Sequence, residues 1–280
     1  MEVAERIRAE GARLTVAERR VATAVLDAPQ LVAFGTVADL ARSAQVGAAS
    51  VVRLANKLGF DGYSELQQAI QGELSAQLRP AAERIHDSSN QSITAHAEAE
   101  LANVRATLSA VGDTALTSLV ERLADVARPV LVVSGDATAG VGRLFADQMG
   151  QLRPGVEVVQ GSEVAVRRAV ALADPESTAV VIDLRRYERW VLDAHAAIDE
   201  RGIWSAALTD GVLSPLAQRA DVTFLVTAGS IGPFDSHVGT LAVLDLITNS
   251  VADALRATAA DRLGAIESAW GDAGALTDGA

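Results

Sequence analysis

Five short apolar runs between residues 130 and 226 constrain the fold of this chain more than any other feature of its sequence. Each run has five or six residues, and each of the first four is followed by a segment with helical periodicity. Strands of a parallel sheet appear as near-continuous apolar runs, because helices cover both faces of such a sheet. We therefore expect a parallel α/β sheet with strands at Val130–Ser134, Val156–Gln160, Ala179–Leu184, Trp204–Thr209 and Val222–Val226.

Residues 1–75 lack such runs and carry helix signals instead. Thr15, with Glu18 three residues later, forms a capping box that begins a first helix, and Pro29 ends this helix. Three further helices are expected over residues 37–44, 48–58 and 64–71, with Thr36 and Ser64 as N-caps and Gly59 just beyond the third helix of the series.

The charge of the chain is distributed unevenly. Of 24 lysines and arginines and 36 acids, residues 1–80 hold 9 of each, so the whole net charge of −12 comes from residues 81–280. An electroneutral first domain still binds nucleic acid if its cations gather on one face. We expect four parts: a helical domain at 1–78, a linker and connecting helix at 79–114, the α/β domain at 115–255, and the end of a last helix with a tail at 256–280. This last helix is expected to run from about His237 to Trp270.

Residues 36–60 have the pattern of a helix-turn-helix. Small or apolar residues, Ala41, Val46, Val51, Leu54 and Leu58, recur where two crossing helices would meet. The alternative is a helical hairpin with a merely solvated face. On the helix-turn-helix interpretation, polar, cationic and small side chains face DNA. The candidate DNA-binding residues are Thr36, Ala48, Ala49, Ser50, Arg53, Asn56 and Lys57.

The same segment resembles the N-terminal domain of the RpiR-type family of bacterial regulators. The resemblance rests on four stretches and is most specific in the Leu-Gly-Phe-x-Gly-Tyr run. Two departures are Gly47, where a serine-like cap is usual, and Ser50, where Thr is common. The matching stretches are Leu14-Thr15, Thr36 to Ala41, Ser50 to Leu54 and Lys57 to Leu66. The resemblance implies a double-stranded DNA operator as partner.

A glycine loop follows the first expected strand. Ser134, Gly135 and Thr138 lie just before a helix, where backbone N–H groups and a helix N-terminus attract anions. The alternative is a strand–helix turn that needs glycine for its backbone angles. Residues 115–255 resemble the SIS domain, which implies a flavodoxin-like sheet that binds ligands at the carboxyl ends of its strands. The supporting stretches are this loop, Ala206 to Asp210, Leu213 to Ala217, Ala220 to Val222 and Phe234 to Ser236.

The loop after the third strand departs from the SIS pattern. Phosphosugar-binding SIS domains usually carry a Ser/Thr-rich loop there, whereas this chain has arginines, including Arg185 and Arg186, followed by Tyr187. Arginine is a bidentate partner for phosphate or carboxylate. The alternative is that these arginines are surface charges paired with Glu188 or Asp193. We expect the two loops and the start of the last helix to converge on an electropositive ligand site, with Ser134, Gly135, Thr138, Arg185, Arg186, Tyr187, Ser236 and His237 as candidate ligand-binding residues.

Several kinds of site are not expected. The chain has no cysteine, and its four histidines, His86, His96, His195 and His237, lack metal spacing. No general base or nucleophile pattern stands out, so we expect no catalytic residue, no metal and no cofactor. The first ten residues do not read as a signal peptide, and no run of about 18 apolar residues suggests a membrane span. A cytoplasmic location is expected.

These observations predict a multidomain chain: an all-α helix-turn-helix domain followed by an α/β flavodoxin-like SIS domain with a five-stranded parallel sheet. The predicted function is a DNA-binding transcriptional regulator that senses a small anionic metabolite, such as a phosphosugar or sugar acid. It is expected to form a homo-oligomer, a dimer or a tetramer. The alternatives are a sugar-phosphate isomerase with an added helical domain, and an orphan regulator whose SIS domain only dimerises.

Overall fold

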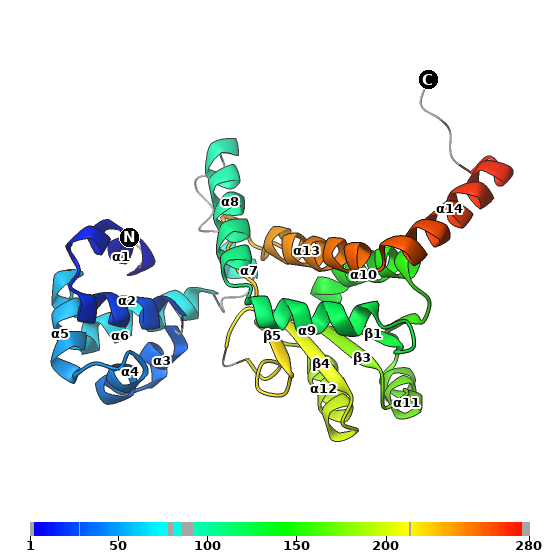
Figure 1. Cartoon of the computed structure of the whole chain (residues 1–280). Helices are drawn as coiled ribbons and strands as arrows, with labels where there is room; N and C mark the ends of the chain where they lie inside the picture. The colour runs from blue at the N-terminus through cyan, green and yellow to red at the C-terminus, as the bar shows by residue number, and fades with distance from the viewer. Residues whose placement is uncertain (1–2, 28, 78–80, 86–91, 213, 276–280) are drawn as a thin grey trace. The chain divides into compact units, whose positions relative to one another are not determined.

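A computed structural model describes residues 3–27, 29–77, 81–85, 92–212 and 214–275 of the chain. The chain forms two compact units, Met1–Glu83 and Arg84–Ala280. Figure 1 traces both units from the N-terminus in blue to the C-terminus in red. Each unit packs its own hydrophobic core.

The first unit is helical throughout its described residues. Its core is made of apolar side chains at helical spacing, such as Val21, Leu40, Val51 and Leu54, none of which exposes any surface. The elements are α1 (Val3–Glu10), a 3-10 turn η1 (Gly11–Arg13), α2 (Val16–Asp27), α3 (Pro29–Phe34), α4 (Val37–Ser43), α5 (Ala48–Lys57) and α6 (Tyr63–Gln77). A short α7 (Ala81–Arg84) follows.

Most of the predicted helix boundaries in this unit are confirmed. Thr15 donates its N–H to Glu18 and accepts one from it, as a capping box requires. Gly59 has a φ of +84°, the left-handed conformation expected after a helix. Pro29 follows α2 and is also the first residue of α3. The sequence pattern did not predict helix α3. The prediction of Ser64 as an N-cap is wrong: α6 begins at Tyr63, so Ser64 lies in its first turn, and Glu65 of that turn reaches back to accept the N–H of Asp61.

The second unit contains the five predicted strands, all parallel, in the order β2-β1-β3-β4-β5. This is the order of a flavodoxin-like sheet. The strands are β1 (Val130–Ser134), β2 (Val156–Val159), β3 (Thr178–Ile182), β4 (Trp204–Thr209) and β5 (Val222–Leu225), which differ from the expected runs by at most two residues at an end.

Helices cover both faces of this sheet (Figure 1). On one face Val132 packs with residues of α9, α10 and α13, and on the other Val133 packs with residues of α11 and α12. The alternation follows from the two-residue period of a strand. These helices are α9 (Asp113–Ala124), α10 (Ala139–Leu152), preceded by a 3-10 turn η2 (Asp136–Thr138), α11 (Glu163–Leu172), α12 (Arg189–Glu200) and α13 (Val238–Ala254).

Two predictions about this unit are wrong. The segment after β4 forms turns in its described residues, not a helix. The last helix is not continuous, because α13 gives way at Leu255 to α14 (Arg256–Ala273), and the two helices are bent by 103°. Helix α13 packs on the sheet core, whereas α14 packs on α10 through the buried Ala259 and an Arg262 hydrogen bond to Gly150. The two packing surfaces diverge, and neither Pro nor Gly marks the bend.

Helix α8 (Ile93–Ser109), expected as a connecting helix, is docked onto the second unit. It packs against α13, and its Asn103 amide exchanges two hydrogen bonds with the backbone of Gly229. Thr107 accepts a hydrogen bond from the N–H of Thr227. These bonds hold the segment after β5 against α8, so α8 positions the loop that leads into α13.

Among the described helices, none is by itself long and apolar enough to cross a membrane. Only the bent pair α13 and α14, taken together, reaches the length and composition of a span.

Candidate DNA-binding surface and candidate ligand site

Helices α4 and α5 form the predicted helix-turn-helix. Thr36 caps α4 through a reciprocal pair of hydrogen bonds with Asp39, so the Thr36 side chain, although exposed, already serves the fold. The turn reverses at Gln45, which has a φ of +52°, and Val46 donates its N–H to the Ala41 carbonyl. This places the N-terminus of α5 directly after an exposed turn.

One face of α5 is open to solvent, as the spacing predicted. Ala48, Ala49 and Arg53 are exposed, and so is Val52, which sequence reasoning did not include. The expectation that Ser50 lies on this face is wrong, because only 6% of Ser50 is exposed. Its hydroxyl accepts a 2.8 Å hydrogen bond from the Arg53 guanidinium. Ser50 therefore orients Arg53 from within the unit.

Asn56 and Lys57 are also exposed in part, but both contact the protein itself. The Asn56 side-chain oxygen accepts the N–H of Gly62 at 3.0 Å. Lys57 Nζ lies 2.9 Å from Glu18 Oε2 and 2.6 Å from the Arg13 carbonyl oxygen. The backbone hydrogen bond from Thr15 and the bond from Lys57 lower the pKa of Glu18 to about 2. These contacts tie the end of α5 to its neighbours.

A groove that sequence reasoning missed lies beside α2. Its volume is about 800 Å³, and the cations Arg19 and Arg20 line it together with hydroxyl and amide side chains. Both arginines are exposed. The lining residues are Leu14, Thr15, Val16, Arg19, Arg20, Thr23, Ala24, Ser43, Ala44 and Gln45, none of them acidic. The one sequence signal was the pair of adjacent arginines in the first half of α2.

In the second unit, the expected loops do meet at the carboxyl edge of the sheet. The glycine loop after β1 touches the loop after β3, because a Cβ placed on Gly135 would lie 2.8 Å from Asp183 and from Glu188. The loop after β3 touches the segment before α13, because Arg185 pairs with Asp235 at 2.8 Å. The predicted juxtaposition of the three segments is thus present in the structure.

The glycine loop is built as expected for a close approach, but its groups are occupied. Gly135 is buried, and so is Thr138, of which only 1% is exposed. The Thr138 hydroxyl lies within hydrogen-bond distance of the Gly135 and Ile182 carbonyls. The N–H of Asp136 donates a 2.5 Å hydrogen bond to Glu188 Oε1. A carboxylate of the chain therefore occupies the position where the sequence predicted an external anion. Ser134, at the end of β1, is 7% exposed.

In the loop after β3, Arg185 and Tyr187 contact other residues of the protein, whereas Arg186 is open to solvent. Arg185 lies 2.8 Å from Asp235 and 3.7 Å from Asp210, and its side chain is only 12% exposed. Tyr187 donates its hydroxyl to Asp210 at 2.6 Å, and burial, the largest cause, raises the pKa of this phenol. Arg186 is exposed and has a φ of +69°, a strained conformation for a side chain of this size.

Ser236 and His237 lie where the last helix was expected to start. Ser236 is buried and its hydroxyl bonds to Glu100 of α8 at 2.5 Å. His237 is the N-cap residue of α13, and its buried Nδ1 lacks a hydrogen-bond partner among the described atoms. Arg84 joins the cluster through a 2.7 Å contact with Asp235.

The expected excess of positive charge at this edge is not found among the described residues. Four carboxylates, those of Asp183, Glu188, Asp210 and Asp235, lie between the arginines. Burial raises the pKa of Asp183 to about 6, with the neighbouring carboxylates adding to the effect of desolvation. The described residues offer no group of three acids or histidines placed to hold a metal. Sequence reasoning missed this gathering of acids because they come from three segments, those after β3, β4 and β5.

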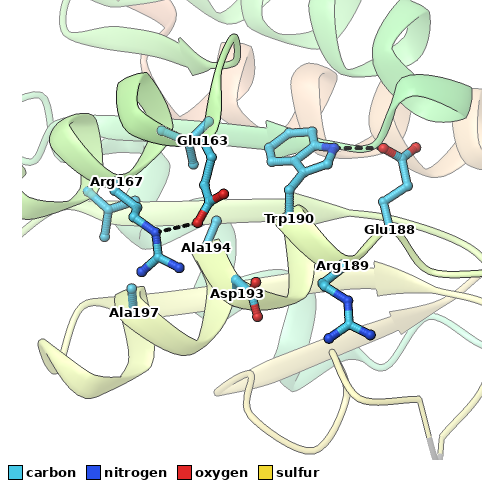
Figure 2. Close-up of a pocket in the computed structure, with 10 residues that line it drawn as sticks. Glu163, Arg167, Glu188, Arg189, Trp190, Asp193, Ala194 and Ala197 are labelled. Carbon is cyan, nitrogen blue, oxygen red and sulfur yellow. Dashed lines mark hydrogen bonds and ion pairs between the residues drawn. The ribbon is translucent and has the colours of Figure 1, made fainter.

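A cavity of about 410 Å³ lies beside this edge, between α11 and α12. Figure 2 shows the Trp190 ring along one side of it, with the indole N–H directed at Glu188. That hydrogen bond measures 2.6 Å. The Glu188 carboxylate thus accepts one hydrogen bond from Trp190, which lines the cavity, and one from the glycine loop. Arg167 and Glu163 pair at 2.9 Å across the opposite rim.

Comparison with known proteins matches both units. Residues 1–77 match the helix-turn-helix domain of the rpiR family, and residues 123–250 match the SIS domain. An uncharacterized HTH-type transcriptional regulator of Haemophilus influenzae is 26% identical over 247 residues, covering 84% of each chain. The fold and these matches define a helix-turn-helix transcriptional regulator with a SIS domain. The chain belongs to the RpiR family of such regulators.

Solved structures show the same architecture. The sugar isomerase domain of an RpiR transcription factor from Sphaerobacter thermophilus is 26% identical, with a TM-score of 0.58, and covers 64% of this chain and 99% of its own. The Vibrio vulnificus NanR protein, solved in complex with ManNAc-6P, is 21% identical, with a TM-score of 0.59, and covers 96% of this chain and 98% of its own.

Proposed function

We propose that this regulator binds a double-stranded DNA operator through its first unit and is controlled by a small anionic sugar derivative bound to its second unit. One observation carries the proposal: the same chain contains a helix-turn-helix with an exposed α5 face and a parallel sheet at whose carboxyl edge three candidate ligand loops meet. The effector would be a phosphosugar or a sugar acid.

The DNA half of the proposal rests on the α5 face and on the groove beside α2. Arg53 is placed to reach a base edge, while the small Ala48 and Ala49 let the backbone approach the duplex. Arg19 and Arg20 in the groove would contact phosphates, which carry most of the affinity but no sequence information. Asn56 and Lys57 support the end of α5, and Lys57 retains some exposed surface for a phosphate.

The effector half rests on the groups at the carboxyl edge. Donor groups of three kinds, N–H, hydroxyl and guanidinium, would come from Ser134, the Gly135–Thr138 loop and the Arg185–Tyr187 loop. Ser236 and His237, at the start of α13, would complete the site. NanR, which shares the two-unit architecture, was solved with a phosphosugar, and this supports the same ligand class here. The arginines in place of a Ser/Thr-rich loop make a sugar acid the second candidate.

A sensor is favoured over an isomerase. An aldose–ketose isomerase needs a general base poised over its substrate. His237 caps the start of α13, and the carboxylates of Asp183 and Asp235 already accept hydrogen bonds from backbone and arginine donors. The relatives that match most of the chain are named transcriptional regulators. An aldose–ketose isomerase assay on hexose and pentose phosphates should therefore show no turnover, and turnover would reverse this choice.

The proposed regulator is a cytoplasmic homo-oligomer, a dimer or a tetramer, because two-fold symmetry lets two α5 helices contact two half-sites. Light scattering at micromolar concentration should give at least twice the monomer mass, and a monomer would contradict the proposal.

The experiment that tests the proposed function combines both halves. A thermal-shift screen of phosphosugars and sugar acids identifies a binder, and gel shifts on genomic fragments with and without it measure regulation. We expect the binder to change operator affinity by roughly 5- to 150-fold, the range of typical allosteric coupling. The orphan-regulator alternative predicts DNA binding with no response to any anion.

A further inference from the structure

Glu188 stands out because it begins α12 without capping it. It is the N-cap residue of this helix, yet its side chain accepts no backbone N–H from the first turn of α12. Ser, Thr, Asp or Asn at an N-cap would normally accept those N–H groups. The carboxylate instead reaches the loop after β1 and accepts the N–H of Asp136 at 2.5 Å.

The Asp136 N–H is the group that an incoming anion would use. It is the first N–H of η2, which leads directly into the 14-residue α10, so no helical carbonyl uses it and it lies near the positive end of that helix. Gly135 allows the approach, because a Cβ there would lie 2.8 Å from Glu188 Oε1. The fold has therefore built a carboxylate site at this point and filled it with its own side chain.

Glu188 is held there by N–H groups and not by a cation. Its second oxygen accepts the Trp190 indole N–H at 2.6 Å, and no lysine or arginine of the described residues forms an ion pair with it. Two hydrogen bonds without a salt bridge hold the carboxylate less firmly than the paired arginines hold Asp235. A doubly charged phosphate would both compete for the same donor and repel the carboxylate.

The surroundings leave room for Glu188 and Trp190 to move. The Trp190 ring borders the cavity of about 410 Å³. The aliphatic Val166 and Val170 line it too, together with charged side chains such as Arg167. The loss of the Glu188 contact would free the indole N–H, and the ring has space beside it to turn.

We propose that Glu188 is a built-in competitor for the effector's anionic group, one that sets how strongly the second unit discriminates among anions. This rests on the proposed function. A ligand that takes the Asp136 N–H displaces the Glu188 carboxylate, and the Trp190 ring then changes its environment. Weak or singly charged anions are excluded because they gain no more from the site than Glu188 does.

The test compares wild-type protein with Glu188→Gln, which keeps the size and acceptor oxygen of the side chain but removes its charge. The probes are inorganic phosphate and a hexose 6-phosphate, titrated by calorimetry. Glu188→Gln should bind both roughly ten-fold more tightly, since a charge-assisted competitor bond becomes a neutral one. Glu163→Gln, a carboxylate on the opposite rim of the cavity, is the matched control and should bind as wild type does.

Tryptophan fluorescence supplies an independent readout. Saturating phosphate should shift the emission of the wild type, and Trp190→Phe should abolish the shift, since Trp204 and Trp270 lie elsewhere in β4 and α14. Trp190→Phe also removes one of the two donors that hold Glu188 and should tighten phosphate binding by about three-fold. It serves in place of Glu188→Gln if melting shows that variant to be unfolded.

The outcomes are distinguishable. Equal or weaker phosphate binding by folded Glu188→Gln, with clear binding by the wild type, overturns the role of Glu188 and leaves the proposed function intact. Absence of binding to both probes in every variant overturns this role, and the proposed function then rests on the sugar-acid arm of the thermal-shift screen.

Discussion

The Arg185 guanidinium lies 2.8 Å from the Asp235 carboxylate and joins the loop after β3 to the segment that leads into α13. Asp210, 3.7 Å away at the end of β4, also faces it. An arginine that the sequence assigns to an external anion is thus already neutralised by acids from two other segments. A ligand at this edge would have to compete with Asp235 and Asp210 for Arg185. Ligand binding would therefore change these ion pairs, and through them the segments that they join.

We predict that Arg185→Ala/Arg186→Ala keeps DNA binding and loses the effector response. The two guanidinium groups are the cations that the loop after β3 brings to the candidate ligand site, while the helix-turn-helix belongs to the other unit. Gel shifts with a confirmed effector measure this. Arg143→Ala, which removes an exposed arginine of α10, is the control. Normal regulation of the double mutant would place the ligand site elsewhere.

We predict that Arg53→Ala weakens operator binding by about 1–3 kcal/mol and weakens binding to random-sequence DNA less, because Arg53 is the exposed cation placed to read a base. Fluorescence anisotropy on both duplexes gives the two affinities. Ser50→Ala should show a smaller loss of the same kind, since Ser50 only holds Arg53 in place. Unchanged operator affinity of Arg53→Ala would remove this residue from the interface.

We predict that Arg19→Ala and Arg20→Ala weaken operator and random-sequence binding alike. Each lost phosphate contact should lower the slope of log affinity against log salt by about one. Anisotropy titrations at several salt concentrations provide the slope, with Arg143→Ala again as the charge-matched control. A slope equal to that of the wild type would show that the groove beside α2 does not face DNA.

We predict that Arg153→Met destabilises the second unit by about 3 kcal/mol or more. Arg153 is fully buried, and its guanidinium donates to the carbonyl oxygens of Leu123, Asp125 and Pro154 at 2.6–3.0 Å and to that of Arg128. Met fills the volume but leaves these carbonyls without donors. Urea unfolding measures the loss, and a change no larger than that of the exposed control Arg143→Met would contradict it.

We predict that Asp183→Asn removes a pH-dependent part of the stability. Burial raises the pKa of Asp183 to about 6 from 3.8, so between these values the folded state binds more protons than the unfolded state. Its contribution is therefore full below about pH 4 and declines as the pH rises to 6, by about 3 kcal/mol at most. The free energy of unfolding of wild type minus Asp183→Asn should fall over this interval.

The comparison with a variant is needed because His195 acts in the opposite direction. Burial lowers the pKa of His195 from 6.5 to about 4, so its contribution to stability grows with pH over the same interval. A difference between wild type and Asp183→Asn that stays flat from pH 4 to 6 would show that Asp183 titrates normally.

The sequence by itself determined the five strands, most of the helices and the layers that they form. Apolar runs at Val130 and Ala179 and capping pairs such as Thr15 with Glu18 act through neighbours in the chain, so their spacing can be read directly. Parallel strands place their carboxyl ends at one edge, and for this reason the convergence of the Gly135 and Arg185 loops was also predictable.

Tertiary structure decided what those residues do once they meet. The orientation of Ser50 into the unit, the pairing of Lys57 with Glu18 across 39 residues, and the bend at Leu255 depend on which surfaces pack together. The charge of the ligand edge depends on Asp210 and Asp235, each far in sequence from Arg185. Coulomb interactions act through space and are strongest where water is excluded, so a chain's local sequence cannot show which charges will neutralise one another.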